Sequence, residues 1–250
     1  MLTSALLRTH GFAHAFADRT GGISQAPFDA ANFGRNVGDE PDRVAENHRR
    51  LAEAVGYDGA RLFEASQVHG AAVIEAGGDA AALRAQPADA LVARAPGDAV
   101  GVRTADCVPL LVGDRERGAV AAIHAGWRGV VQGVVPAALA ALGGRALLVA
   151  IGPHIRGPAF EVGPEVAEEI RRAAGVEVRV GTSAAGKPLV DLAAAIRAQL
   201  ARAGIAPEHI DDVGGCTLTE PDRFFSFRRD GARSGRHLAV IVARAQSSGP

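Results

Sequence analysis

Short apolar runs bounded by polar residues or glycine recur along the chain. Runs of about five apolar residues with such flanks are typical of buried β-strands. They lie at Ala99–Val102, Val108–Val112, Ala119–Ile123, Leu147–Ile151 and Leu238–Val242. The pattern therefore predicts a core built on β-sheet.

Four stretches between or beside these runs have the spacing and end signals of helices. They are Pro41–Val55, Val130–Leu142, Glu165–Ala174 and Leu192–Ala203. Pro164 is a good first-turn residue for the third, and Asp191 and Gly204 are suited to begin and end the fourth. Asp39 is the candidate cap for the first. Strands interleaved with helices predict one mixed α/β (α+β) domain over residues 1–250, with a frayed tail at residues 246–250.

Composition narrows the class of protein. The 250 residues are 48% apolar and 22% charged, with a formal net charge of -1. These are ordinary globular values, and they give no global field that would attract nucleic acid. No apolar stretch approaches the ~20 residues of a membrane span, and the first residues lack a signal-peptide pattern. Two cysteines exclude a disulfide framework. We expect a cytoplasmic protein without membrane or nucleic-acid partners.

Reactive residues stand where apolar runs end or in separate polar segments. Each of three segments supplies one metal-ligand type: His69 in Gln67–Gly70, Cys107 in Thr104–Cys107 and His124 in His124–Gly129. The intervals of 38 and 17 residues differ from the closely spaced pairs of structural zinc sites. Two histidines and one thiolate from separate loops match a catalytic zinc with an open fourth position. Such a zinc lowers the pKa of bound water towards ~7.

Several longer motifs carry a resemblance to a known family. Between about residues 19 and 242, in order, the chain resembles the YfiH family, bacterial relatives of the human laccase-domain-containing protein that were long labelled polyphenol oxidases. The motifs are Arg19–Ser24, Gln67–Gly70, Ala88–Val92, Thr104–Pro109, His124–Gly129, Ile151–Pro153, Phe160–Val162, Cys216–Thr217 and Phe224–Arg229.

The resemblance implies a fold, an activity and a ligand set. The fold would be mixed β-sheets packed together and flanked by helices. The activity would be phosphorolysis of adenosine, inosine and methylthioadenosine, with deamination of adenosine, so the partners would be purine nucleosides and phosphate. The family's ligands carry over to His69, Cys107 and His124, the three residues that the spacing selects. Zn²⁺ is the expected ion, and Cu²⁺ is the second candidate because histidine and thiolate also bind copper.

Other residues are candidates for substrate binding and proton transfer. Arg19, Arg128 and Arg228 are expected to bind phosphate, with Arg229 as a further candidate. Asp106 is predicted either to carry a proton or to orient a ligand histidine. These assignments rest on position within the motifs.

Four more residues have a structural alternative. Trp127 is expected to anchor the core rather than to stack on a purine, and Cys216 is expected to be a buried structural thiol. Asp89 either orients a ligand or caps a turn. His154 stands where many relatives have cysteine. Because some relatives also lack that cysteine, we expect the chemistry to be intact; the alternatives are that His154 alters the pocket wall or adds a ligand.

Three alternative functions stay open at this point. A copper-dependent phenol oxidase is disfavoured because only eight histidines are scattered along the chain. A cysteine hydrolase would use Cys107 as nucleophile and His124 as its base, with cell-wall precursors as the candidate substrates. The non-enzymatic alternative is a structural zinc or nucleotide-binding module. Three ligands instead of four argue against the structural version, and the binding version would take up adenosine without turnover.

Overall fold

The apolar runs become the central strands of two β-sheets. The computed structural model describes residues 1–246, and its strands are β1 (His14–Phe16), β2 (Leu62–Phe63), β3 (Val73–Glu75), β4 (Ala90–Ala93), β5 (Ala99–Thr104), β6 (Val108–Asp114), β7 (Val120–Ala125), β8 (Leu147–Ile151), β9 (Arg179–Thr182), β10 (Pro188–Val190), β11 (Ile210–Asp212) and β12 (His237–Val242). All five predicted strands are present, extended or shifted by at most two residues at an end.

The predicted helices are also present, one of them in two pieces. The helices are α1 (Ala5–Thr9), α2 (Pro41–Val55), α3 (Ala80–Leu83), α4 (Trp127–Gln132), α5 (Val134–Leu142), α6 (Pro164–Ala174), α7 (Leu192–Arg202) and α8 (Phe227–Asp230). The single helix predicted over Val130–Leu142 is wrong. Gly133 adopts φ +86°, a left-handed conformation that ends α4 and turns the chain into α5.

Of the two predicted helix N-caps, one is confirmed and one is wrong. Asp191 accepts a hydrogen bond from the Ala194 amide and begins α7 as predicted. The prediction for Asp39 is wrong, because the residue before α2 is Glu40 and no side chain caps that helix. Asp39 instead accepts a hydrogen bond from the Asn32 amide group.

The two main sheets have mixed strand directions. The larger has the order β11-β8-β6-β7-β4-β3, and the smaller has the order β1-β12-β5-β2. The β6–β7 pair is antiparallel with Val108 opposite Ala125 and Pro109 opposite His124. Strand β12, the last in the chain, lies antiparallel between β1 and β5.

Alternating side chains on these strands divide the interior into three clusters. On β6, Leu111 joins the cluster between the two sheets, whereas Leu110 and Val112 join a cluster under helices α5, α6 and α7. On β12, Ile241 faces the other sheet, and Val240 packs in a third cluster with residues of α2. This period of two is what places helices on both outer faces.

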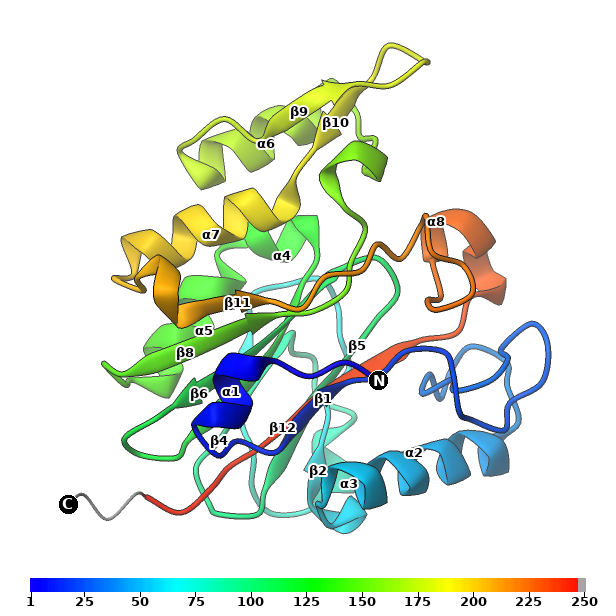
Figure 1. The fold of residues 1–250 in the computed structure, drawn as a ribbon, viewed down its shortest axis with the longest axis vertical. Coiled ribbons are helices and arrows are strands. Elements are labelled where there is room, and N and C mark those ends of the chain that lie inside the picture. The colour runs from blue at the N-terminus through cyan, green and yellow to red at the C-terminus, as the bar shows by residue number, and fades with distance from the viewer. Residues whose placement is uncertain (247–250) are drawn as a thin grey trace.

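The result is a four-layer arrangement of helices, sheet, sheet and helix. In Figure 1, α6 and α7 lie at the top of the molecule and α2 lies at the bottom, with the two sheets between them. The predicted class, mixed α/β with packed sheets flanked by helices, is confirmed. Residues 247–250 of the predicted frayed tail lie outside the residues that the structure describes.

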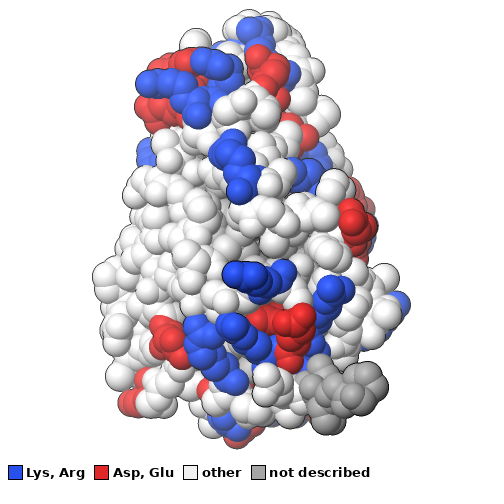
Figure 2. Space-filling view, turned by 90° about the vertical axis from the view of Figure 1, so that its left-hand side faces the viewer, with Lys and Arg blue, Asp and Glu red and all other residues white. Residues whose placement is uncertain are grey.

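The surface carries mixed charge. Figure 2 shows basic and acidic side chains in small groups separated by uncharged surface, with both signs close together at the top of this face. Within residues 1–246, none of the helices is both long and apolar enough to span a membrane.

Candidate metal centre and nucleoside pocket

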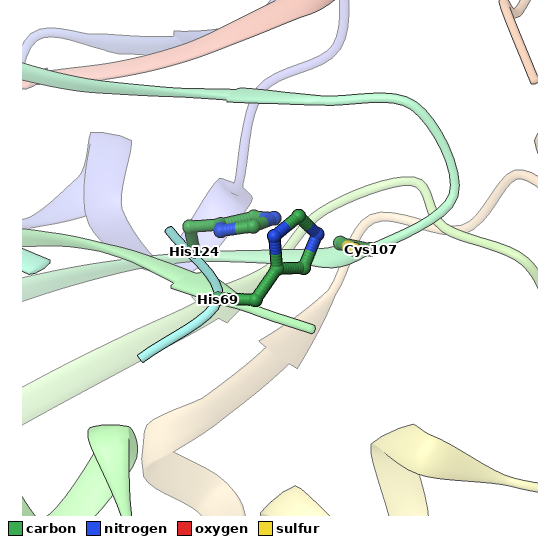
Figure 3. A group of neighbouring side chains, drawn as sticks. All are labelled: His69, Cys107 and His124. Atoms are coloured by element: carbon green, nitrogen blue, oxygen red, sulfur yellow. The ribbon is translucent and has the colours of Figure 1, made fainter. Parts of the chain in front are cut away.

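Three elements that are distant in sequence bring His69, Cys107 and His124 together. His69 lies in the loop between β2 and β3, Cys107 directly precedes β6, and His124 is on β7. Because β6 and β7 pair, Cys107 and His124 are placed near each other across the sheet. Figure 3 shows the three side chains converging from these separate segments.

The geometry of the group suits one small ion. One ligand atom from each residue lies within 4.8 Å of the others, and the two imidazole rings are 4.8 Å apart at an angle of 76°. Gly126 makes this approach feasible, because a Cβ there would lie 3.0 Å from Cys107 Sγ and 3.0 Å from His69 Cδ2. His69 itself adopts φ +60°, a conformation rare outside glycine that is often found at functional sites.

Asp89 fixes both histidine-bearing segments. Its Oδ1 atom is 2.7 Å from His124 Nδ1 and accepts the His69 amide at 2.9 Å, while Oδ2 accepts the amides of Val68 and Gly70. The carboxylate is fully buried. A proton on Nδ1 shared with Asp89 leaves His124 Nε2 as the ligand atom, the usual carboxylate–histidine–metal arrangement.

The same contacts shift two pKa values in opposite directions. Burial opposes the charged thiolate, but His124 and hydrogen bonds from His124 and His69 lower the pKa of Cys107 to about 6. Burial also opposes a charge on His124, yet Cys107 and Asp89 raise its pKa to about 9. Near neutral pH the metal-free pair is therefore a thiolate beside an imidazolium, and a cation would replace the proton on His124.

The donor set fits zinc. Two imidazoles and one thiolate are borderline and soft donors, and three protein ligands leave one coordination position for another molecule. Within residues 1–246 this is the one three-residue group suited to a metal. Copper accepts the same donors, but one group does not provide the several coppers of a multicopper oxidase.

Asp106 does not orient a ligand histidine, so that part of its prediction is wrong. Its Oδ1 accepts the Thr217 hydroxyl at 2.6 Å and its Oδ2 accepts the Arg228 amide at 2.6 Å. Asp106 adopts φ +90° and thereby ties the loop that carries Cys107 to the segment around α8. The orienting role belongs to Asp89, which lies just before β4 and was left as one of two alternatives by the sequence.

The metal group lies in a pocket of about 870 Å³. This is near the upper end of the ~300–1,000 Å³ typical of small-molecule sites. Arg128 and Arg228 line it as predicted, and they stack on the rings of Trp127 and Phe160, respectively. Trp127 serves two roles, since it also packs against the core under the helices.

Arg19 is not among the residues that line this pocket. Its guanidinium donates to the carbonyls of Asp29 and Pro221 and pairs with the Asp29 carboxylate. Arg229 likewise donates to the carbonyls of Thr217 and Phe224. Both side chains hold loops together, and both predictions of phosphate binding are without support from their positions.

Four further arginines line the pocket that the sequence did not single out: Arg35, Arg84, Arg103 and Arg236. They come from four separate segments, so no local motif marks them as a group. Arg236 directly follows Gly235, outside the motifs from which the candidate phosphate-binding arginines were chosen.

A second buried histidine lies outside the metal group. His154 is fully buried, shares a hydrogen bond between Nδ1 and the Gly152 carbonyl, and forms a β-bridge with Cys216. It is absent from both the metal group and the pocket lining. The two alternatives for His154, an altered pocket wall and an added ligand, therefore do not fit its position, and the expectation that the chemistry is intact stays a prediction. Cys216 is buried, as expected for a structural thiol.

Comparison with known proteins assigns the chain to a family. A family model described as multi-copper polyphenol oxidoreductase laccase matches residues 13–244. The chain is 37% identical over 233 residues to a protein of Shigella flexneri named purine nucleoside phosphorylase YfiH, covering 92% of this chain and 93% of that one. The chain belongs to the YfiH family. The resemblance identified from the motifs is thus confirmed.

Other relatives of the YfiH family carry the same name. A purine nucleoside phosphorylase of Pseudomonas aeruginosa is 41% identical over 228 residues, covering 89% of this chain and 90% of its own. One of Deinococcus radiodurans is 40% identical over 243 residues, covering 94% of this chain and 92% of its own.

Solved structures extend the similarity to the fold. The crystal structure of YlmD from Geobacillus stearothermophilus superposes with a TM-score of 0.86 at 33% identity, covering 94% of this chain and 92% of that one. The crystal structure of YfiH from Bacillus licheniformis gives 0.83 at 28% identity, covering 92% and 91%. YfiH-family proteins thus share this arrangement of sheets and helices.

Proposed function

We propose that the protein is a metal-dependent purine nucleoside phosphorylase. It would act on adenosine, inosine and 5′-methylthioadenosine, and would deaminate adenosine as a second reaction. The observation that carries the proposal is the His69, Cys107 and His124 group inside a pocket lined by arginines. Relatives that are named purine nucleoside phosphorylases, about 40% identical, support the same class of reaction.

The pocket provides surfaces for both substrates. Trp127 and Phe160 offer aromatic faces on which a purine ring packs. Arg128 and Arg228 offer the planar, permanently charged donors that bind phosphate oxygens. In phosphorolysis a phosphate oxygen bonds to C1′ of the ribose, and the C1′–N9 bond breaks with its electron pair passing to the purine. The products are ribose 1-phosphate and the free base, which takes up a proton.

His69, Cys107 and His124 would hold the ion, and Zn²⁺ fits their donor atoms. When bound, zinc supplies Lewis-acid polarisation of an oxygen or nitrogen atom in the substrate. Asp89 keeps His124 oriented and its Nδ1 protonated. Asp106 has both carboxylate oxygens engaged, so its role here is to hold the Cys107 loop against α8.

The deciding experiment is chromatography of adenosine incubated with the purified protein, with and without phosphate, before and after chelation. Adenine formed only with phosphate and metal is the expected result, and inosine formed without phosphate reports deamination. Absence of adenine and of ribose 1-phosphate with the zinc-loaded protein would refute phosphorolysis. Cys107→Ala in the same assay links any product to the metal group.

A second candidate function, a cysteine hydrolase, is favoured by one specific observation. Asp89, His124 and Cys107 form a continuous chain of carboxylate, imidazole and thiolate, which resembles the orienter, base and nucleophile of covalent catalysis. Such an enzyme would cleave an amide bond and would be insensitive to chelation but inactivated by thiol alkylation. Phosphorolysis lost on chelation and restored by zinc would exclude it as the source of that activity.

A further inference from the structure

The pocket carries more positive charge than one phosphate and a neutral nucleoside require. Six arginines line it: Arg35, Arg84, Arg103, Arg128, Arg228 and Arg236. Asp106 is the one acidic residue that lines it. Arg128 and Arg228, which stack on Trp127 and Phe160, already suffice for one phosphate dianion. The remaining four therefore provide more positive charge than the proposed reaction requires.

Neighbouring carboxylates neutralise only part of this set. The buried Glu64 lies 3.4 Å from both Arg35 and Arg103, so one carboxylate serves two guanidinium groups. Arg236 donates through one nitrogen to the carbonyls of Ser234 and Gly235. Within residues 1–246, Arg84 and Arg236 have no carboxylate partner, and Arg84 Nε is buried without a hydrogen bond. A buried donor without an acceptor is costly unless a ligand supplies one.

Arg84, Arg103 and Arg236 line the same pocket as the metal group. Arg236 is close enough to Cys107, Asp106 and Arg103 to interact electrostatically with them. Arg103 is on β5, directly before the loop that ends in Cys107, and Arg84 follows α3. All three are partly buried, where charge-assisted hydrogen bonds are stronger than on an open surface.

We infer that Arg84, Arg103 and Arg236 form a subsite for a phosphoryl group carried by the ligand itself, and that the pocket binds nucleoside 5′-monophosphates more tightly than nucleosides. The inference rests on the proposed function, because it takes the ligand to contain a purine nucleoside. A nucleoside monophosphate adds one dianion to the same base and sugar, and this dianion would supply the negative partner that Arg84 and Arg236 lack among the described residues. The pocket is large enough for a nucleotide together with the phosphate at Arg128 and Arg228.

Isothermal titration of the zinc-loaded protein with adenosine and with AMP, in buffer without phosphate and under conditions in which chromatography detects no inosine, tests the subsite. The measured quantity is the ratio of the Kd for adenosine to the Kd for AMP. We expect a ratio of about 10 or more in the wild type, falling towards 1 in Arg84→Gln and in Arg236→Gln. Arg49→Gln removes an exposed arginine of α2 that does not line the pocket, and it should keep the wild-type ratio. Thermal unfolding confirms that each variant is folded.

Two results would overturn the subsite. One is equal or weaker binding of AMP by the wild type. The other is an AMP preference that survives both Arg84→Gln and Arg236→Gln but disappears in Arg128→Gln, which would place the phosphoryl group on the other arginines. Phosphorolysis of adenosine is measured separately. Turnover of adenosine without an AMP preference refutes the subsite alone, whereas an AMP preference without turnover refutes the proposed reaction alone.

Discussion

In two histidine–cysteine pairs of this molecule, the pKa of the buried histidine is shifted in opposite directions. His124 shares its Nδ1 proton with the Asp89 carboxylate and faces Cys107, and its pKa is raised to about 9. His154 shares its Nδ1 proton with a backbone carbonyl, forms a β-bridge with Cys216, and has its pKa lowered to about 4 by burial and by Arg156. Residue types alone therefore do not make a metal centre. The carboxylate behind the histidine and a third ligand distinguish the first pair from the second.

The largest expected difference between the two pairs is in turnover. Cys107→Ala removes one of three metal ligands, and we expect phosphorolysis to fall more than about 1,000-fold, since the metal is lost or misplaced. Cys216→Ala, the matched control in the other pair, should retain activity within about threefold. Chromatographic assay with metal analysis checks both variants. Equal activity of the two variants would mean that Cys107, like Cys216, is not needed for turnover.

The second expected difference concerns acid stability. His154 has a pKa near 6.5 in the unfolded chain and about 4 in the folded protein. Below pH 6.5 protons therefore bind preferentially to the unfolded chain, and the free energy of unfolding falls as the pH drops towards 4. His154→Cys removes this dependence, and the metal-free variant should lose about 3 kcal/mol less than the wild type between pH 6.5 and 4. Urea unfolding at several pH values measures it. His209→Cys controls for removing a partly exposed histidine, and equal slopes for His154→Cys and wild type would contradict the prediction.

The carboxylate behind His124 provides the third test. Asp89→Asn leaves the shape but removes the charge that orients His124, and we expect the affinity for zinc to fall about 10–100-fold. Asp114→Asn is the matched control, because Asp114 is also a buried aspartate that accepts backbone amides, at Glu116 and Arg117. Competition with a chromophoric chelator measures both. Unchanged zinc affinity in Asp89→Asn would show that the carboxylate is not what separates the two pairs.

The smallest expected effect is on zinc affinity when a methyl group is added at Gly126, next to the metal group. Gly126→Ala places a methyl group 3.0 Å from Cys107 Sγ and His69 Cδ2, so these ligands must move by a few tenths of an ångström. We expect zinc affinity to fall about tenfold, as for other changes that misplace ligands. Gly77→Ala, where the new Cβ meets nothing within 4 Å, should leave zinc affinity unchanged. Equal zinc affinities for the two variants would show that the metal group accommodates the added methyl group without losing affinity.

The sequence predicted the elements well where they depend on local pattern. The apolar runs of β6, β7 and β8 and the capped helix α7 are set by period and by end residues, which are visible in a short window. The division of α4 from α5 at Gly133 was not predicted. Apolar residues continue on both sides of this glycine, so the pattern indicated a single helix. The three predicted metal ligands lie together, as both the spacing and the family motifs indicated.

The remaining site residues depend on tertiary contacts that no window contains. Asp106 was chosen as a candidate to orient a histidine because it adjoins Cys107, yet Asp89 reaches His124 across the β4–β7 pair. The sequence signal available for Asp89 was its place in the Ala88–Val92 motif, directly before an apolar run. Arg19 was chosen from a motif but binds loop carbonyls, whereas Arg84 and Arg236 reach the pocket from elements about 150 residues apart.

The position of β12 has a consequence for how the chain is made. During synthesis, His69, Cys107 and His124 all emerge in the first half of the chain, and β1 emerges before any of them. Yet β1 lies beside β12, and Asp106 holds Thr217 and the start of α8, so these partners are all made after the three candidate metal ligands. The smaller sheet therefore stays incomplete until β12 has been made. A nascent chain interrupted after β11 would already contain all three metal ligands but would lack the segment that fixes the loop carrying Cys107.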